Sequence, residues 1–199
     1  MLRFIVFLLI AFSSCAQQDS ILFIGNYQKI CVPGNHVFKS DSLPDKINLY
    51  SMIFIYSGAH SDLDSTDIER IVLYIHKGGN LYIGGENWPL QAELNQLTSF
   101  LFQKTCYGNY NGADAESAKN GRLELATLER IPSGKSTTSL PLDPNFNVEA
   151  WTNDQPLIVS AILGEGKLVM DGGYSRFYCA YESDDSKKVW SRIIEFFHE

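Results

Sequence analysis

Residues Ile71–Glu86 read IVLYIHKGGNLYIGGE and place a helix end, a turn and a buried strand in succession. Counted from Ile68, three residues before this stretch, apolar residues fall at i, i+3, i+4 and i+7. This spacing predicts one buried helix face made of Ile68, Ile71, Val72 and Ile75. Ser65 or Thr66 can cap this helix, which should begin near Asp67. Gly78-Gly79 should end it in the usual C-cap position. The run Leu81–Ile83 then predicts a buried strand that ends in Gly84-Gly85.

Similar apolar runs precede this unit, and a second helix follows it. Residues Ile21–Ile24 and Met52–Tyr56 predict two earlier buried strands. Pro89 suits the first turn of the next helix, with Asn87 as its cap. That helix has the leucine stripe Leu90, Leu94, Leu97 and Leu101. Strands that are apolar throughout and alternate with helices predict a mostly parallel sheet covered on both faces. The expected fold is an α/β, three-layer α/β/α sandwich with a flavodoxin-like sheet.

The second half of the chain is less regular. Residues Tyr107–Gly121 are polar and rich in glycine and asparagine, so we expect an exposed loop. Residues Pro132–Pro156 should form an irregular excursion with short strands. The runs Leu157–Leu163 and Lys167–Asp171 flank Gly-Glu-Gly and predict a C-terminal β-hairpin. Residues Lys187–Phe197 predict a closing helix.

Length and composition indicate one ordinary globular domain. The chain has 199 residues, of which 45% are hydrophobic and 20% charged, and this excludes collagen-like, coiled-coil and disordered classes. It has 16 basic and 23 acidic residues, for a net charge of -7. This charge argues against nucleic acid as a partner.

The N-terminus has the features of an export signal. Arg3 supplies a positive charge, and the apolar run Phe4–Phe12 spans only about 14 Å, roughly half a bilayer. Phe12-Ser-Ser-Cys15 resembles the bacterial lipoprotein box, in which the cysteine is lipidated. An alternative cleavage site follows Ala16, and an uncleaved anchor is the third alternative. We therefore expect a signal peptide at 1–14, a linker at 15–20 and one domain at 21–199, exported to the periplasm or cell envelope or secreted as a soluble protein.

Three cysteines remain after that signal: Cys31, Cys106 and Cys179. We expect all three to be small buried hydrophobes, although an oxidising compartment would permit one disulfide with one thiol left over. Their spacing matches no zinc motif, and we expect neither a metal nor a cofactor.

Polar and glycine residues follow each predicted strand, at the edge where ligands bind in open parallel sheets. Glu86, between a strand and a helix, is the strongest catalytic candidate, with Asp171 and His60 as partners. The carboxylate of Glu86 could instead stabilise the start of its own helix. The candidate ligand-binding residues are Asn26, Tyr27, Gly58, His60, Gly85, Glu86, Asn87, Trp88, Asp171, Gly172, Tyr174 and Arg176. The alternative is that these residues only form turns.

Ser133-Gly-Lys-Ser136 looks like the end of a phosphate-binding loop. Glu129 stands where the motif requires a glycine, and Pro132 lies within the stretch. The sequence therefore does not predict such a loop here.

The span Ile53–Glu86, together with the late stretch Gly164–Gly173, resembles the class I glutamine amidotransferase-like superfamily. In that family, a cysteine stands in a G-x-C-x-G elbow after the strand. Here Gly84 matches the first glycine, Glu86 takes the cysteine position, and Trp88 replaces the second glycine. The late His-x-Glu motif is also missing. The resemblance implies the fold and argues against glutamine hydrolysis through a thioester.

Two classes of function remain after these observations. The first is a non-catalytic binding or scaffold domain, held at the membrane through a lipid on Cys15, with a small polar ligand, a glycan or an envelope protein as its partner. A purely structural partner of an envelope complex would use exposed aromatics, with Tyr107, Tyr110, Trp151 and Tyr181 as candidates. The alternative is a hydrolase that uses Glu86 with Asp171 or His60.

Overall fold

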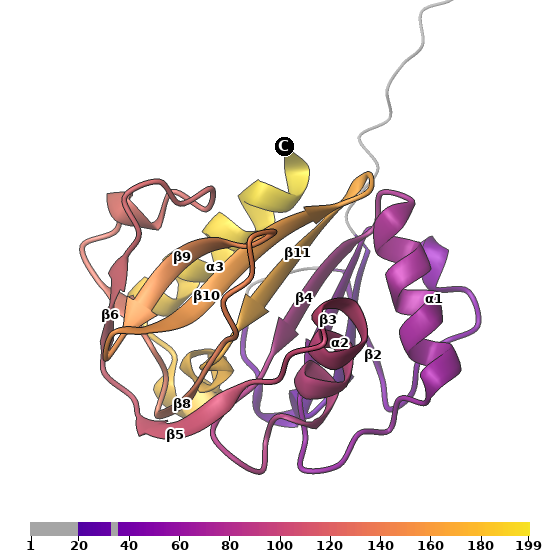
Figure 1. The fold of residues 1–199 in the computed structure, drawn as a ribbon, viewed down its shortest axis with the longest axis horizontal. Coiled ribbons are helices and arrows are strands. Elements are labelled where there is room, and N and C mark those ends of the chain that lie inside the picture. Colours follow the sequence, from indigo (N-terminus) through magenta and orange to yellow (C-terminus); the bar gives the residue numbers. More distant parts are fainter. Residues whose placement is uncertain (1–19, 33–35) are drawn as a thin grey trace, which may run out of the picture.

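The computed structural model describes residues 20–32 and 36–199, and it confirms the α/β/α sandwich (Figure 1). A nine-stranded sheet has the order β2-β1-β3-β4-β11-β10-β9-β6-β7. The parallel half consists of β2 (Val37–Ser40), β1 (Ile21–Gly25), β3 (Met52–Tyr56), β4 (Asn80–Gly84) and β11 (Gly166–Asp171). The antiparallel half adds β10 (Gln155–Leu163), β9 (Asn147–Thr152), β6 (Asp114–Ser117) and β7 (Ile131–Pro132). The flavodoxin-like sheet and the late hairpin are as predicted.

The central strands are apolar throughout because helices cover both faces of the sheet. Along β3, Phe54 and Tyr56 belong to one core cluster, whereas Ile53 and Ile55 belong to the other. Helix α3 (Asp184–His198) packs on the first face, and α1 (Ser65–His76) and α2 (Ala92–Phe102) pack on the second. Figure 1 shows α1 and α2 on the near side of the sheet and α3 behind it. Successive side chains point to opposite faces, so a doubly covered strand requires an uninterrupted apolar run.

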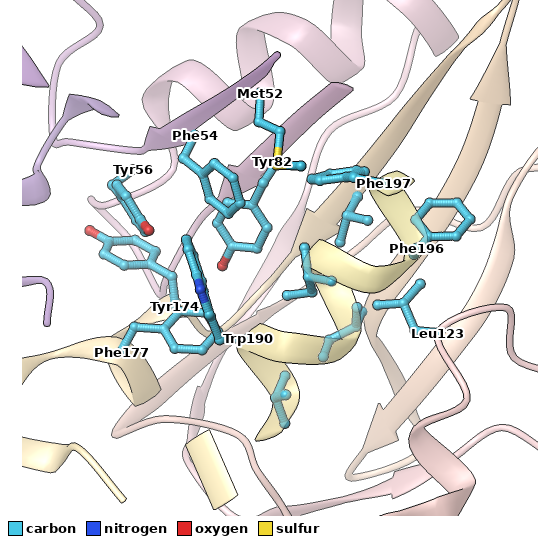
Figure 2. Close-up of a cluster of buried hydrophobic side chains, with 14 of the residues drawn as sticks. Met52, Phe54, Tyr56, Tyr82, Leu123, Tyr174, Phe177, Trp190, Phe196 and Phe197 are labelled. Carbon is cyan, nitrogen blue, oxygen red and sulfur yellow. The ribbon is translucent and has the colours of Figure 1, made fainter. Parts of the chain in front are cut away.

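An aromatic cluster fills the core between the sheet and α3 (Figure 2). The ring centroid of Trp190 on α3 lies 4.4 Å from that of Phe54 and 5.7 Å from that of Phe177. Tyr82 on β4 stacks on Phe54 at 5.0 Å. Each such aromatic pair contributes roughly 0.5–1.5 kcal/mol beyond the burial of its area. The cluster therefore fixes α3 against the strands whose ends form the site described below.

The first helix begins slightly earlier than expected. Helix α1 starts at Ser65, and its cap is Asp64 rather than Ser65 or Thr66. The Asp64 carboxylate accepts the Asp67 N–H at 2.8 Å, and Asp67 accepts the Asp64 N–H in return. This reciprocal capping box satisfies two otherwise unpaired donors. The helix ends at the expected glycine, since Gly78 follows the C-cap with a φ of 95°.

The second helix begins at Ala92, so the expected start at Pro89 with an Asn87 cap is wrong. Residues 86–91 form a hydrogen-bonded turn instead. The Asn87 carbonyl accepts the Leu90 N–H at 3.0 Å, and the Leu90 carbonyl accepts the Glu86 N–H at 2.8 Å. This turn holds Glu86 at the end of β4, several residues before the helix.

The expectation of an exposed loop at Tyr107–Gly121 is also wrong. β5 (Tyr107–Asn111) pairs with β8 (Ser136–Ser139) in a separate two-stranded sheet, and β6 extends the main sheet beside β9. Most side chains of β5 are exposed, so the sequence has no apolar pattern that would predict this strand. The short strands expected within Pro132–Pro156 are present, and the closing helix begins at Asp184.

Cys31 and Cys179 form a disulfide, with their Cα atoms 4.8 Å apart. The expectation that all three cysteines are buried hydrophobes is therefore wrong for this pair. It holds for Cys106, a free thiol whose pKa is raised to about 12 by burial. The paired cysteines are 148 positions apart, so no local spacing motif reveals them.

None of the helices in the described ranges is long and apolar enough to cross a membrane. Residues 1–19, including the predicted signal and Cys15, lie outside the described residues.

Candidate functional site

The carboxyl ends of the parallel strands are tied together by Tyr174, which follows β11. Its hydroxyl donates to the Ser57 carbonyl after β3 at 2.8 Å and accepts from Asn26 Nδ2 after β1 at 3.1 Å. β4 passes directly beneath this side chain, since a Cβ added at Gly84 would lie 2.7 Å from the Tyr174 Cβ. Glycine is required here because the backbone and the tyrosine approach so closely. Tyr174 and Asn26, both predicted as ligand-binding residues, therefore brace the edge of the sheet.

Glu86 is buried at this edge, with 1% of its surface exposed. Its Oε1 accepts the backbone N–H of Ser175 at 2.6 Å, and its Oε2 accepts the hydroxyl of Ser136. Burial raises the pKa of the Glu86 carboxyl to about 7, against the lowering effect of the hydrogen bonds from Ser136 and Ser175. The carboxylate thus joins the end of β4 to two segments from the second half of the chain, and these hydrogen bonds involve Ser175 and Ser136 rather than the start of α2.

A buried ion pair lies beside Glu86. Asp171 and Arg176 are 0% and 1% exposed, and Arg176 Nη2 donates to Asp171 Oδ1 at 2.7 Å. Asp171 also accepts the Gly173 N–H at 2.9 Å and the Tyr82 hydroxyl at 2.8 Å. Burial raises the pKa of Asp171, and the Arg176 guanidinium opposes that effect. Arg176 Nε donates to the Gly173 carbonyl, whereas Nη1 is buried with no hydrogen-bond partner.

Glu86 lines a pocket of about 370 Å³, which we call the strand-end pocket. Its walls come from the segment after β1, the turn after β4, β8 and the segment after β11. The lining residues are Lys29, Glu86, Leu90, Lys135, Ser136, Ser175, Tyr178, Ala180 and Tyr181. A pocket of this size suits a small molecule.

A second pocket of about 610 Å³, the side pocket, shares Lys135 and Tyr181 with the first. Its lining residues are Gly112, Ala113, Asp114, Arg130, Pro132, Ser133, Gly134, Lys135, Arg176, Tyr181 and Ser186. A third pocket of about 350 Å³ lies at the opposite edge, between Tyr50 and Tyr74, where β3 and β4 begin. The first two pockets adjoin the predicted site edge, and the third does not.

The three catalytic candidates are only partly brought together. Glu86 and Asp171 flank the same turn, because Glu86 binds Ser175 and Asp171 binds Gly173 and Arg176. His60 is exposed and lines neither of these two pockets. A catalytic role for these residues stays a prediction.

The other predicted ligand residues have mostly structural contacts. The Gly58 N–H donates to Glu93, and Gly85 and Gly172 donate to the backbone of Asp171 and Leu157. The Tyr27 hydroxyl donates to Asp41 at 2.8 Å. Trp88 is 74% exposed, and Asn87 lies in the turn before α2. Of the predicted set, Glu86 and Arg176 line these pockets.

The sequence-based candidates omitted Lys29 and Tyr178, named Tyr181 only as an exposed aromatic of a contact patch, and set aside Lys135 and Ser136. The Ser133–Ser136 stretch forms a wall of both pockets, although it is no phosphate-binding loop. Its Lys135 N–H donates to the Ser175 hydroxyl at 2.8 Å. The small, polar Ser-Gly-Lys-Ser sequence was the one feature that could have indicated these pocket residues. The described residues contain no cluster of three or more His, Cys, Asp or Glu side chains that could hold a metal ion.

No family model and no curated protein matches this chain. Solved structures do resemble it. The cytoplasmic protein STM1381 from Salmonella typhimurium aligns with a TM-score of 0.67 and 15% identity, over 89% of this chain and 99% of that one. A ThuA-like protein from Bacteroides uniformis aligns with a TM-score of 0.59 and 8% identity, over 90% and 91%.

A β-galactosidase from Rahnella sp. R3 aligns with a TM-score of 0.62 and 10% identity, over 89% of this chain and only 31% of the enzyme. The chain therefore spans about a third of that enzyme's length. At these identities the likeness concerns the fold alone. The strand order, the late hairpin and these similarities together show that the chain has the class I glutamine amidotransferase-like fold.

Proposed function

We propose that this protein is a non-catalytic binding domain of the cell envelope, whose strand-end pocket holds a small polar ligand. The observation that carries the proposal is that Glu86 lines that pocket with both carboxylate oxygens engaged in hydrogen bonds. The hydrogen bonds from Ser175 and Ser136 to Glu86 hold two walls of the strand-end pocket in place before a ligand binds. A preformed pocket saves the free energy of ordering its walls on binding.

The same contacts favour binding over catalysis by Glu86. A general base must reach the proton that it removes, and the two oxygens of Glu86 already accept hydrogen bonds from the protein. Asp171 is held by Arg176, Tyr82 and Gly173 and lines neither pocket. Both carboxylates are therefore engaged by protein donors, and the hydroxyl proton in the strand-end pocket that Glu86 already reaches is that of Ser136.

A hydrolase is the second candidate, and one contact favours it. The Ser136 hydroxyl donates to Glu86, and both residues line the strand-end pocket. A hydroxyl beside a carboxylate with a pKa near 7 is an arrangement that can activate a nucleophile. Under this alternative Ser136, rather than Asp171 or His60, would be the partner of Glu86.

We further propose that the domain is exported and held at the membrane by a lipid on Cys15, with a small polar ligand, a glycan or an envelope protein as its partner. The Cys31–Cys179 disulfide supports export, because disulfides persist mainly in oxidising compartments. Expression in a bacterium fed a radiolabelled fatty acid tests the anchor. Label should enter the wild-type protein and be absent from Cys15→Ala, whereas equal labelling of both would contradict lipidation at this residue.

A thermal-shift screen tests the binding function, with sugars, peptidoglycan fragments, amino acids and nucleotides as ligands. A ligand at 100 times its Kd should stabilise the domain by about 2.7 kcal/mol, or roughly 5–10 °C in Tm. Tyr178→Ala, in the pocket wall, should lose the shift, and Tyr50→Ala, at the opposite edge, should keep it. A ligand that is consumed by wild type but not by Ser136→Ala would instead support the hydrolase.

A further inference from the structure

We propose that the strand-end pocket and the side pocket together bind an anionic small molecule, one that carries carboxylate or phosphate groups. This inference rests on the proposed binding function and names its ligand class. Four basic residues line the two pockets: Lys29, Lys135, Arg130 and Arg176. The chain as a whole has a net charge of -7, so this gathering of cations opposes the overall charge.

Two of these cations are available to a ligand. Lys29 and Lys135 are exposed, and neither has a carboxylate within 4 Å among the described residues. Their ammonium groups lie over tyrosine rings instead. Lys29 Nζ is 5.7 Å from the Tyr178 ring centroid, and Lys135 Nζ is 5.8 Å from that of Tyr181. Such contacts leave most of the charge of an ammonium group uncompensated.

The two lysines are held around one aromatic surface. The Tyr178 and Tyr181 rings stack with centroids 6.3 Å apart, and the disulfide through Cys179 anchors the segment between them to Cys31, two residues from Lys29. Lys135 lines both pockets and therefore stands where they join. A ligand with a flat or ring-shaped body can rest on the tyrosines while its anionic groups reach the lysines.

Arg176 contributes less directly. It lines the side pocket as a residue, whereas Asp171 does not, but its side chain is fully buried in the ion pair. Its Nη1 donor is buried without a partner, which leaves part of the guanidinium charge unsatisfied.

The acidic groups at the pockets do not cancel this charge. Asp114 pairs with Arg130 at 2.8 Å, and the Glu86 carboxylate is directed to Ser175 and Ser136. The exposed ammonium groups of Lys29 and Lys135 therefore remain to attract an anion. Carboxylate and phosphate are the groups that ammonium and guanidinium donors bind most strongly.

Calorimetric titration of the purified protein with sodium citrate and with sodium phosphate tests the proposal. Each titration is matched with sodium chloride of equal ionic strength, because salt screens exposed charges. We expect saturable binding of at least one anion, a loss of at least tenfold in affinity for Lys135→Met, and a smaller loss for Lys29→Met. Lys119→Met, an exposed lysine outside both pockets, should bind as wild type does. Binding of citrate alone would identify carboxylates as the ligand group, and binding of phosphate alone would identify phosphoryl groups.

Neutral sugars form a further arm, which separates this inference from the proposed function. If a neutral sugar binds and Tyr178→Ala abolishes it, while neither anion binds, the anionic ligand class is overturned and the binding function stands. If neither anion nor any ligand of the thermal-shift screen binds, both proposals fail. Equal loss of anion affinity in Lys119→Met and Lys135→Met would also overturn the anion site, because it would reflect net charge alone.

Discussion

Glu86→Gln should change the way in which stability depends on pH. Glu86 has a raised pKa of about 7 in the folded protein, against an ordinary value of 4.5. The folded state therefore holds this proton more tightly than the unfolded state does. The resulting stability is fully present below pH 4.5 and is lost as the pH rises to about 7. At 1.36 kcal/mol per pKa unit, the loss across this window is about 3 kcal/mol.

Glutamine reproduces the protonated form of Glu86 without titrating. Its amide oxygen can accept the Ser175 N–H, and its amide nitrogen can donate to the Ser136 hydroxyl. Glu93 and Asp171 also have raised pKa values, but they are present in both proteins. The difference between wild type and variant therefore isolates Glu86. Relative to wild type, the variant should gain about 3 kcal/mol in free energy of unfolding between pH 4.5 and pH 7.5.

Urea unfolding at four pH values between 4.5 and 7.5 measures this difference. The buried Trp190 supplies the fluorescence signal. Glu69→Gln, on the exposed surface of α1, controls for the substitution itself. Parallel stability curves for wild type and Glu86→Gln would refute the burial of a titrating carboxylate at this position. A variant that loses stability relative to wild type as the pH rises would refute the sign of the shift.

Three further changes test the architecture around the site, each by urea unfolding. Gly84→Ala should destabilise the domain by about 1–3 kcal/mol, since its Cβ would lie 2.7 Å from the Tyr174 Cβ; an unchanged midpoint would contradict that close approach. Removing the disulfide by Cys31→Ala with Cys179→Ala should cost up to about 5 kcal/mol, because the bond closes a loop between residues 148 positions apart; a loss below about 1 kcal/mol would contradict this account. Arg176→Met should cost about 3–5 kcal/mol by leaving Asp171 buried and unpaired, and adding Asp171→Asn should recover part of that loss; a double variant no more stable than Arg176→Met would argue against the pair.

The first half of the fold could be predicted because its signals are local. The apolar run of β3 and the end of α1 at Gly78 each depend on residues that are adjacent in the sequence. β5 was not predicted because most of its side chains are exposed. The strand is defined by backbone hydrogen bonds to β8, which the sequence does not reveal. The start of α2 was missed because the Asn87–Leu90 turn is stabilised by backbone hydrogen bonds, which residue type does not report.

The residues that line the candidate site could be predicted only in part, for a different reason. The strand ends were found because parallel strands bring their carboxyl ends to one edge. The pocket is also lined by Lys29, Ser136 and Tyr178, which come from three segments that are far apart in the sequence. The Cys31–Cys179 disulfide joins the first and last of these segments across 148 positions. A contact of this range leaves no periodicity or spacing in the sequence.

Glu86 makes contacts that the shorter cysteine side chain of the resembled family would not reach. In the resembled family this position after the strand carries a cysteine, a side chain that must stay free to react. Here the carboxylate is longer and acts as an acceptor, so it binds donors from the segments at Ser136 and Ser175. Those contacts bring the Lys135 and Tyr178 segments over the strand ends and close the pocket wall. The acid therefore holds two walls of the pocket together, and under our proposal the lysines and tyrosines around it determine what the pocket binds.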